Sequence, residues 1–160
     1  MFDLDGKRAL VTGASGGIGG AVAAALHGLG ATVALAGRNT TALAERAAAL
    51  GGRCHELSAD LAEPSAAEAL AGDAAAAMGG IDILVNNAGV TRDGLFVRLK
   101  DDDWQAVLDI NLTAGFRLAR ASLRGMMRQR WGRIISITSI VGQTGNTGQA
   151  NYAAAKAGLT

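Results

Sequence analysis

The stretch Leu10-Val11-Thr12-Gly13-Ala14-Ser15-Gly16-Gly17-Ile18-Gly19 decides the fold of this chain. A short apolar run leads directly into a glycine-rich turn, and an Ala-rich helical pattern follows. Glycines spaced G-x-x-x-G-x-G let the backbone turn sharply and approach a phosphate, whose charge is met by free N–H groups and the helix dipole. The stretch therefore predicts a strand, a turn that binds a dinucleotide pyrophosphate, and a helix; the alternative is a glycine-rich turn without a ligand. The predicted binding residues here are Gly13, Ser15, Gly17, Ile18 and Gly19.

Short β-branched or Leu-rich runs continue to alternate with longer Ala-rich stretches along the rest of the chain. This alternation is typical of a parallel sheet with crossover helices. It predicts strands over Arg8–Thr12, Thr32–Ala36, Arg53–Leu57, Ile83–Asn86 and Arg133–Ile137. It predicts helices over Gly17–Leu29, Thr41–Leu50, Ser65–Met78 and Asp102–Arg130, with a last helix from about Gln149. Helix ends are indicated by Gly30, Gly51, Gly79 and Gly132, where left-handed geometry is expected. We expect a single α/β dinucleotide-binding domain over residues 1–160, with a doubly wound, Rossmann-like parallel sheet that binds ligands at the carboxyl ends of its strands.

Composition excludes several functional classes. Of the 160 residues, 49% are hydrophobic and 18% charged, which favours a folded core over disorder. The formal charge of +1, without a basic run, argues against nucleic acid, and no apolar stretch is long enough to span a membrane. Cys54 has no disulfide partner and the first residues are acidic, so we expect a cytoplasmic protein. His27 and His55 lack metal-ligand spacing, so no metal site is predicted.

The end of the second predicted strand, Ala36-Gly37-Arg38, indicates the preferred cofactor. A carboxylate at this corner accepts hydrogen bonds from an adenosine ribose and repels a 2′-phosphate. Here no carboxylate is present, and Arg38 can pair with a phosphate, so NADP(H) is the predicted cofactor. Arg38 as a solvated loop residue is the alternative, and Gly16 provides no second basic group in the turn.

Four residues in the second half of the chain are candidate catalytic groups. Tyr152 and Lys156 are one helical turn apart on the same face, and an ammonium beside a phenol favours its ionised form. Ser139 follows the fifth predicted strand, where a hydroxyl can donate to a substrate carbonyl. Asn111 lies on the apolar flank of a helix, where its amide can distort the helix and hold a water near the lysine. The alternatives are a surface Tyr–Lys pair, a turn or capping hydroxyl, and a buried amide satisfied by backbone.

The order and spacing of these motifs resemble the short-chain dehydrogenase/reductase family across the whole chain. The resemblance includes the Gly turn, Asp60-Leu61 after the third strand, Asn86-Asn87-Ala88-Gly89 after the fourth, and the Tyr152/Lys156 pair. It implies hydride transfer with Tyr152 as general acid, Lys156 lowering the proton affinity of the phenol and binding the nicotinamide ribose, Ser139 orienting the carbonyl, and Asn111 anchoring a water. It also implies that the cofactor contacts Asp60, Leu61, Asn87, Ala88, Gly89, Tyr152 and Lys156. Asp60 as a simple strand-end cap is the alternative.

Three further segments resemble 3-oxoacyl-(acyl-carrier-protein) reductases of type II fatty acid synthesis: Val90–Gly94, Lys100–Trp104 and Gly142–Tyr152. This resemblance implies NADPH-dependent reduction of a β-ketoacyl thioester, with an acidic carrier protein docking near Arg128 and Arg130. Solvated arginines at a helix end are the alternative for that cluster. For the function, the alternatives are a reductase of acetoacetyl-CoA or another small carbonyl compound in the same family, and a non-catalytic nucleotide-binding fragment.

The resemblance also bears on the length of the chain, which ends at Thr160. Family members continue beyond the Tyr–Lys helix through further strands and a substrate-covering loop. We therefore expect these 160 residues to be part of a longer chain, with a domain that is incomplete at its C-terminus and a sheet that lacks the family's C-terminal strands. The fifth strand would then be an exposed edge. A homotetramer is expected for the complete chain.

Overall fold

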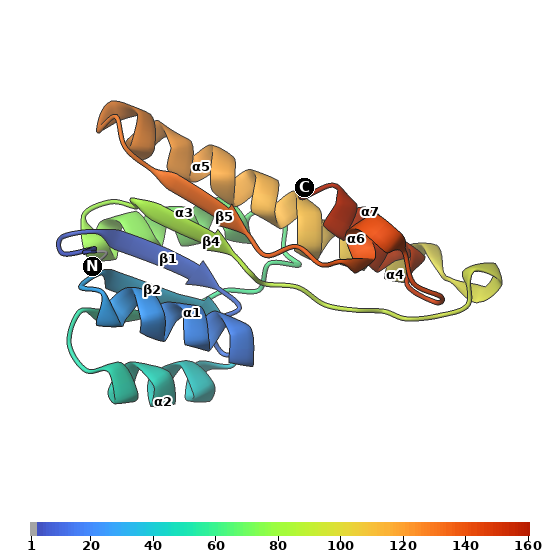
Figure 1. The fold of residues 1–160 in the computed structure, drawn as a ribbon, viewed down its shortest axis with the longest axis horizontal. Coiled ribbons are helices and arrows are strands. Elements are labelled where there is room, and N and C mark those ends of the chain that lie inside the picture. The colour runs from blue at the N-terminus through green and yellow to red at the C-terminus, as the bar shows by residue number, and fades with distance from the viewer. Residues whose placement is uncertain (1–2) are drawn as a thin grey trace.

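The computed structural model describes residues 3–160 and contains one five-stranded parallel sheet (Figure 1). The strand order is β3-β2-β1-β4-β5, so the chain starts in the middle, builds outward to one side, and crosses back to the other. The strands are β1 Arg8–Thr12, β2 Thr32–Gly37, β3 Cys54–Ser58, β4 Ile83–Asn86 and β5 Arg133–Ser136. The predicted fold class, a doubly wound Rossmann-like sheet, is confirmed.

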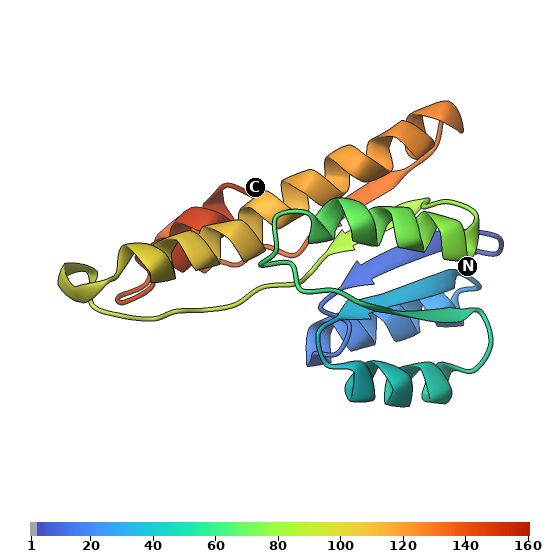
Figure 2. The same cartoon turned by 180° about the vertical axis from the view of Figure 1, so that it is seen from behind.

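Helices cover both faces of the sheet (Figures 1 and 2). On one face lie α1 Gly17–Gly28 and α2 Thr40–Leu50, and on the other lie α3 Ala66–Met78 and α5 Ala114–Arg128. The remaining short elements form an extension beyond one end of the sheet (Figure 1). They are the 3-10 helix η1 Phe96–Arg98, α4 Asp101–Leu108, the π-helix η2 Asp109–Thr113, α6 Val141–Thr144 and α7 Ala150–Ala157. In residues 3–160 no helix is long and apolar enough to cross a membrane.

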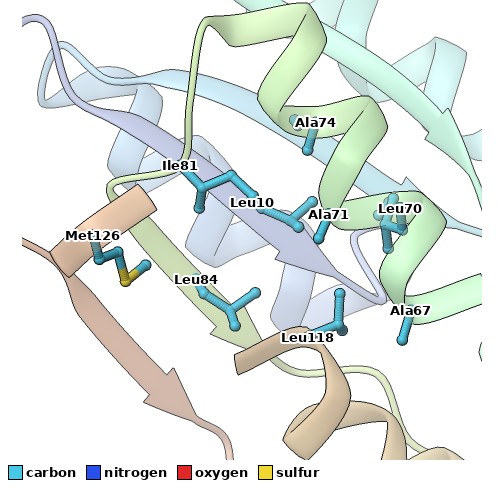
Figure 3. Close-up of a cluster of buried hydrophobic side chains, with 11 residues drawn as sticks. Leu10, Ala67, Leu70, Ala71, Ala74, Ile81, Leu84, Leu118 and Met126 are labelled. Atoms are coloured by element: carbon cyan, nitrogen blue, oxygen red, sulfur yellow. The ribbon is translucent and has the colours of Figure 1, made fainter. Parts of the chain in front are cut away.

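Side chains at alternate strand positions pack into two hydrophobic cores, one on each face of the sheet. Leu10 and Leu84 point from β1 and β4 toward α3 and α5, where they meet Leu118 and Met126 (Figure 3). The α3 side of this core consists mainly of alanines, which let the helix backbone approach the sheet closely. The neighbouring strand residues point to the other face, toward α1 and α2; they include Val11, Val33, Leu35 and Val85. Both faces are thus buried, as parallel sheets require.

The helix predicted over Asp102–Arg130 is interrupted in the structure. It begins as α4, widens into the π-helix η2 around Asn111, and continues as α5 to Arg128. Periodicity did not reveal the interruption, because one inserted residue shifts the apolar face by less than a third of a turn. The predicted left-handed Gly132 was also wrong: Arg130, with φ 56°, makes that turn instead, whereas Gly30, Gly51 and Gly79 have positive φ as expected.

The fifth strand has one neighbour. Within residues 3–160, β5 pairs with β4 alone, and Ile134 and Ile135 are 38% and 45% exposed. Apolar residues of a parallel strand are normally buried on both faces of the sheet. The edge that the sequence led us to expect is therefore present in this part of the chain.

Arg8 and Asp82 join the amino ends of the two central strands. The Arg8 guanidinium donates to both Asp82 carboxylate oxygens, at 2.7 and 2.9 Å, and the Arg8 backbone N–H adds a third bond at 2.9 Å. The Gln129 amide also donates to Asp82, at 2.7 Å. Burial by itself raises the pKa of Asp82, but the hydrogen bonds from Arg8 outweigh burial and hold that pKa below its usual value.

We expect Asp82→Asn to lower the free energy of unfolding at neutral pH by about 2 kcal/mol, because Arg8 loses its charged acceptor. A carboxylate whose pKa is lowered by folding contributes fully above its unfolded pKa of 3.8 and loses that contribution as the pH falls through the lower folded value. The stability of the wild type should therefore fall more steeply than that of the variant below about pH 4. Urea unfolding at several pH values measures this, with Asp73→Asn on the exposed face of α3 as the control. Parallel pH profiles would contradict it.

Candidate functional site

A cleft of about 440 Å³ opens where the first four strands end. Crossover connections place the strand-end loops at this one edge, where open α/β sheets bind ligands. Apart from the Tyr152/Lys156 pair, every residue predicted to contact the cofactor lines it: Gly13, Ser15, Gly17, Ile18, Gly19, Arg38, Asp60, Leu61, Asn87, Ala88 and Gly89. Residues that sequence reasoning did not select also line it, among them Thr12, Asn39, Val90 and Ile110.

The three glycines of the turn have different physical reasons to be glycine. Gly13 has φ +64°, and a Cβ there would lie 2.8 Å from the Asn87 amide nitrogen. A Cβ on Gly19 would overlap the carbonyl oxygen of Gly13. At Gly17, by contrast, the place that a Cβ would take has no other part of the protein within 4 Å. Packing of the protein therefore accounts for Gly13 and Gly19 but not for Gly17, which lines the cleft.

The start of α1 presents the groups that bind a phosphate. The helix begins at Gly17, its N-cap Gly16 is extended, and its first turn has no acidic residue to cancel the helix dipole. The first N–H groups of a helix have no intrahelical acceptor. Ile18 lies beside them and is 64% exposed, which gives the cleft an apolar rim. The cradle fits the pyrophosphate of a dinucleotide.

Thr12, a residue that the sequence analysis missed, connects the turn to the segment after β4. Its buried hydroxyl donates to the Val85 carbonyl at 3.2 Å and accepts from the backbone N–H groups of Asn87 and Ala88, both at 3.0 Å. The Asn87 amide returns a bond to the Thr12 carbonyl at 2.9 Å. The two cleft walls are thus fixed to each other by paired hydrogen bonds. A threonine at a strand end gives no sequence signal for this, because its partners lie more than 70 residues away.

Arg38 and Asp60 face each other across the end of the cleft formed by β2 and β3. The Arg38 Nη1 and the Asp60 Oδ2 are 4.0 Å apart, and both side chains are exposed. Asp60 also accepts from the Ala62 N–H at 3.1 Å, the strand-end cap that was its alternative interpretation. An exposed pair at this distance is weak, so either group can exchange its partner for a ligand.

Lys156 is a buried ionisable group on α7. It is 4% exposed, and its Nζ donates to the carbonyl of Ile137, just beyond β5, at 2.7 Å. Burial lowers the pKa of Lys156 from its ordinary value. The Lys156 Nζ lies 5.7 Å from the centre of the Tyr152 ring, on the same face of α7. The phenol of Tyr152, in a half-buried residue, therefore stands beside a buried amine.

Ser139 is held between two points of contact with the lysine. Two residues before it, Ile137 accepts from the Lys156 amine; three residues after it, Gly142 lies so close to α7 that a Cβ would be 2.8 Å from the backbone of Lys156 and Ala157. The Ser139 hydroxyl accepts from the Val141 N–H at 3.2 Å, as a capping hydroxyl does. Its hydrogen remains available for donation. The structure thus brings Ser139, Tyr152 and Lys156 to one end of the sheet.

Asn111 lies within the π-helix η2 and is 3% exposed. Its amide oxygen accepts from the Val90 N–H at 2.7 Å and its amide nitrogen donates to the Val90 carbonyl at 2.9 Å. The helix is locally distorted, as expected, and the amide is satisfied by backbone, which was the alternative interpretation; the water near Lys156 stays a prediction. Val90 lines the cleft, so Asn111 fixes the wall of the cleft to the helix that packs beside α7.

Asn151, which the sequence analysis did not select, fixes α7 from the other side. It has no solvent exposure, and its amide donates to the carbonyls of Arg92 at 3.0 Å and Asp103 at 3.3 Å. Its oxygen accepts from the N–H of Tyr152 at 2.8 Å. Because an unsatisfied buried amide is costly, these bonds set the position at which α7 begins. The extended segment from Asn87 to Asp93 is thereby attached to both helices.

Residues 3–160 contain no group of three His, Cys, Asp or Glu side chains that could hold an ion.

The chain is similar in sequence to known proteins. Residues 7–160 match the family described as short chain dehydrogenase. Nodulation protein G of Rhizobium sp. (strain N33) is 56% identical over 159 residues, and 3-oxoacyl-(acyl-carrier-protein) reductase FabG of Vibrio cholerae is 47% identical over 158. The chain is covered to 99% in both comparisons but spans only 65% of the length of each relative.

A solved structure is similar over the same region. It is a Sinorhizobium meliloti 1021 protein described as a short-chain alcohol dehydrogenase, with a TM-score of 0.94 and 37% sequence identity. The alignment covers 99% of this chain and 64% of that one.

Alanine substitutions separate the two kinds of glycine in the turn. Gly17→Ala should keep or slightly raise the melting temperature, because alanine favours a helix by up to about 1 kcal/mol, but it should weaken dinucleotide binding about tenfold or more by filling the ligand's space. Gly19→Ala should lose both binding and about 2 kcal/mol of stability through the clash with Gly13. Gly28→Ala, in open space at the end of α1, is the control and should change neither adversely. If Gly17→Ala bound the dinucleotide as tightly as the wild type, the prediction that the ligand lies against Gly17 would be wrong.

Proposed function

The chain belongs to the short-chain dehydrogenase family, and from this premise we propose that the whole protein is an NADPH-dependent reductase that converts a β-ketoacyl thioester to a 3-hydroxyacyl thioester. Similarity to proteins named 3-oxoacyl-(acyl-carrier-protein) reductase supports a thioester substrate. The sequence identity to Nodulation protein G is higher, at 56%. The experiments below therefore compare an acyl-carrier-protein substrate with the corresponding CoA thioester.

One observation carries the proposal: a single stretch of backbone joins the phosphate-binding turn to the Tyr–Lys pair. Asn87 bonds to the turn, Val90 to Asn111, and Arg92 to Asn151. Asn151 in turn bonds to the N–H of Tyr152. A dinucleotide bound in the cleft and a carbonyl substrate near Tyr152 would therefore be held in one rigid frame, which is what proximity and orientation in catalysis require.

The residues around Tyr152 supply the acid–base part of the reaction. A nicotinamide cofactor, when bound, supplies the hydride. Tyr152 donates the proton to the carbonyl oxygen, and the Lys156 ammonium beside the ring stabilises the phenolate that remains. Ser139 donates a hydrogen bond to the same oxygen and so fixes the carbonyl. We assign the cofactor contacts to the cleft residues from Gly13 to Gly89 described above, with Lys156 toward the nicotinamide ribose.

NADPH is the proposed cofactor because of the corner after β2. Gly37 and Arg38 occupy the place where a carboxylate would accept a ribose hydroxyl. Arg38 is paired only loosely, with Asp60 at 4.0 Å, so its guanidinium can turn to a 2′-phosphate.

For partners, we propose an acidic carrier protein at Arg128 and Arg130 and a homotetrameric assembly. Arg128 and Arg130 are exposed at the end of α5, and within residues 3–160 neither lies within ion-pair distance of an acidic side chain. They lie at the amino edge of the sheet, opposite the cleft. The outer face of α5 also exposes Phe116 and Met127, at 58% and 73%, which supports contact between copies.

Turnover tests the function directly. The whole protein should oxidise NADPH with acetoacetyl thioesters faster than NADH, and Tyr152→Phe should reduce turnover about 10³-fold while NADPH still binds. Ser139→Ala should reduce it about 10²-fold. Thr138→Ala removes a neighbouring exposed hydroxyl and should leave turnover unchanged. Turnover of other small ketones with none of thioesters would support a different substrate in the same family, and NADPH binding without any turnover would support a non-catalytic role.

The docking proposal is tested by charge reversal. Arg128→Glu with Arg130→Glu should raise the KM for an acyl-carrier-protein substrate about tenfold and leave KM for the corresponding CoA thioester unchanged, because the lost contacts are electrostatic and remote from the cleft. Arg124→Glu, on the same helix, is the control. An equal effect on both thioesters would show that the arginines do not bind the carrier.

A further inference from the structure

Arg46 reaches from α2 to the glycine turn at the start of α1. Its Nη2 donates to the carbonyl of Gly16 at 3.0 Å and to the carbonyl of Ser15 at 3.3 Å. Ser15 and Gly16 both line the cleft. A guanidinium thus lies against the back of the turn whose front faces the ligand space.

Gly20 leaves the space that the Arg46 guanidinium occupies. It is buried in the second turn of α1, and a Cβ at this position would overlap the Arg46 guanidinium. Glycine inside a helix costs about 1 kcal/mol relative to alanine. The position of Arg46 gives a packing reason for this glycine, in the way that the Gly13 carbonyl does for Gly19.

Arg46 also brings a charge that the turn lacks. The sequence from Gly13 to Gly20 contains no basic residue. Within residues 3–160 no carboxylate lies within ion-pair distance of Arg46, whereas Arg38 faces Asp60. In the same part of the chain the Arg46 Nε and Nη1 donate no hydrogen bond, and the Arg46 residue is only half-buried.

The turn that Arg46 holds lies against the end of β2. The Ser15 hydroxyl oxygen is 3.0 Å from the position of a Cβ on Gly37, the last residue of that strand. In sheets of this kind the adenosine ribose lies at this corner. Arg46 and Arg38 therefore approach the same corner, from α2 and from the β2 loop.

We propose that Arg46 is a specificity-determining residue, which favours a dinucleotide with a phosphate on the adenosine 2′-oxygen over one with a free hydroxyl. This rests on the proposed function only in taking a nicotinamide dinucleotide as the ligand of the cleft. The Arg46 guanidinium provides a positive charge beside the turn, and the carbonyls of Ser15 and Gly16 hold it in place.

Binding measured without substrate tests the proposal. In the whole protein, Arg46→Gln should raise the Kd for NADPH about tenfold and leave the Kd for NADH within about twofold. Gly20→Ala should shift the same ratio in the same direction, because the new methyl group displaces the guanidinium while the charge stays on the protein. Arg124→Gln, which removes an exposed arginine from α5, should change neither constant.

Ionic strength gives a readout that a purely structural role would not move. Between about 50 mM and about 500 mM KCl, the preference of the wild type for NADPH should fall more than that of Arg46→Gln, since salt screens the charge. Equal weakening of NADPH and NADH would overturn the proposal and make Arg46 a support of the turn alone. If Gly20→Ala left the ratio of the Kd values for NADPH and NADH unchanged, the role given to Gly20 in positioning Arg46 would be wrong.

The two proposals fail in different ways. If wild type shows the expected binding ratios but reduces no thioester, the proposed reaction is wrong and the role of Arg46 stands. If it reduces thioesters with NADPH and Arg46→Gln binds both dinucleotides normally, the role of Arg46 is wrong and the reaction stands. If it binds neither dinucleotide, both are wrong.

Discussion

The hydrogen bonds of the Thr12 hydroxyl are the constraint on which the rest of the site depends. Thr12 ends β1, the central strand, and bonds to β4 through Val85 and to the segment after it through the N–H groups of Asn87 and Ala88. The glycine turn starts one residue later. Its conformation therefore follows from the sheet register, and Gly13 and Gly19 are needed because Asn87 packs so closely against the turn.

The same reliance on backbone contacts extends to the reactive end of the molecule. Beyond Asn87 the chain leaves the sheet as an extended segment, without strand partners to hold it. Two buried amides take over that role: Asn111 pairs with the backbone of Val90, and Asn151 with the carbonyl of Arg92. Buried amides are suited to this, because each donates and accepts in a fixed geometry and is costly to leave unpaired. Tyr152 then follows Asn151 directly, so its position depends on bonds made about 60 residues away.

The sequence was sufficient for what is local or periodic, and insufficient for what is tertiary. The β1 and β4 bounds, the doubly wound parallel sheet and the glycine turn follow from apolar runs, crossover rules and spacing. Thr12 and Asn151 could not be selected in this way, since a polar residue at an element's end looks the same whether it caps a helix or joins two segments. Arg46 was hidden for the same reason: its contacts cross from α2 to α1, and only Gly20, an unexplained glycine inside a helix, signalled that something else fills that space.

The burial of Lys156 has a cost in folding free energy. Burial disfavours its charged form and lowers its pKa, yet an ammonium has three donors and only the Ile137 carbonyl accepts from it within residues 3–160. A site optimised for stability would fill this position with an apolar side chain of similar volume. A buried amine with unused donors is instead suited to a ligand that offers hydroxyl acceptors, and binding such a ligand would offset part of the desolvation.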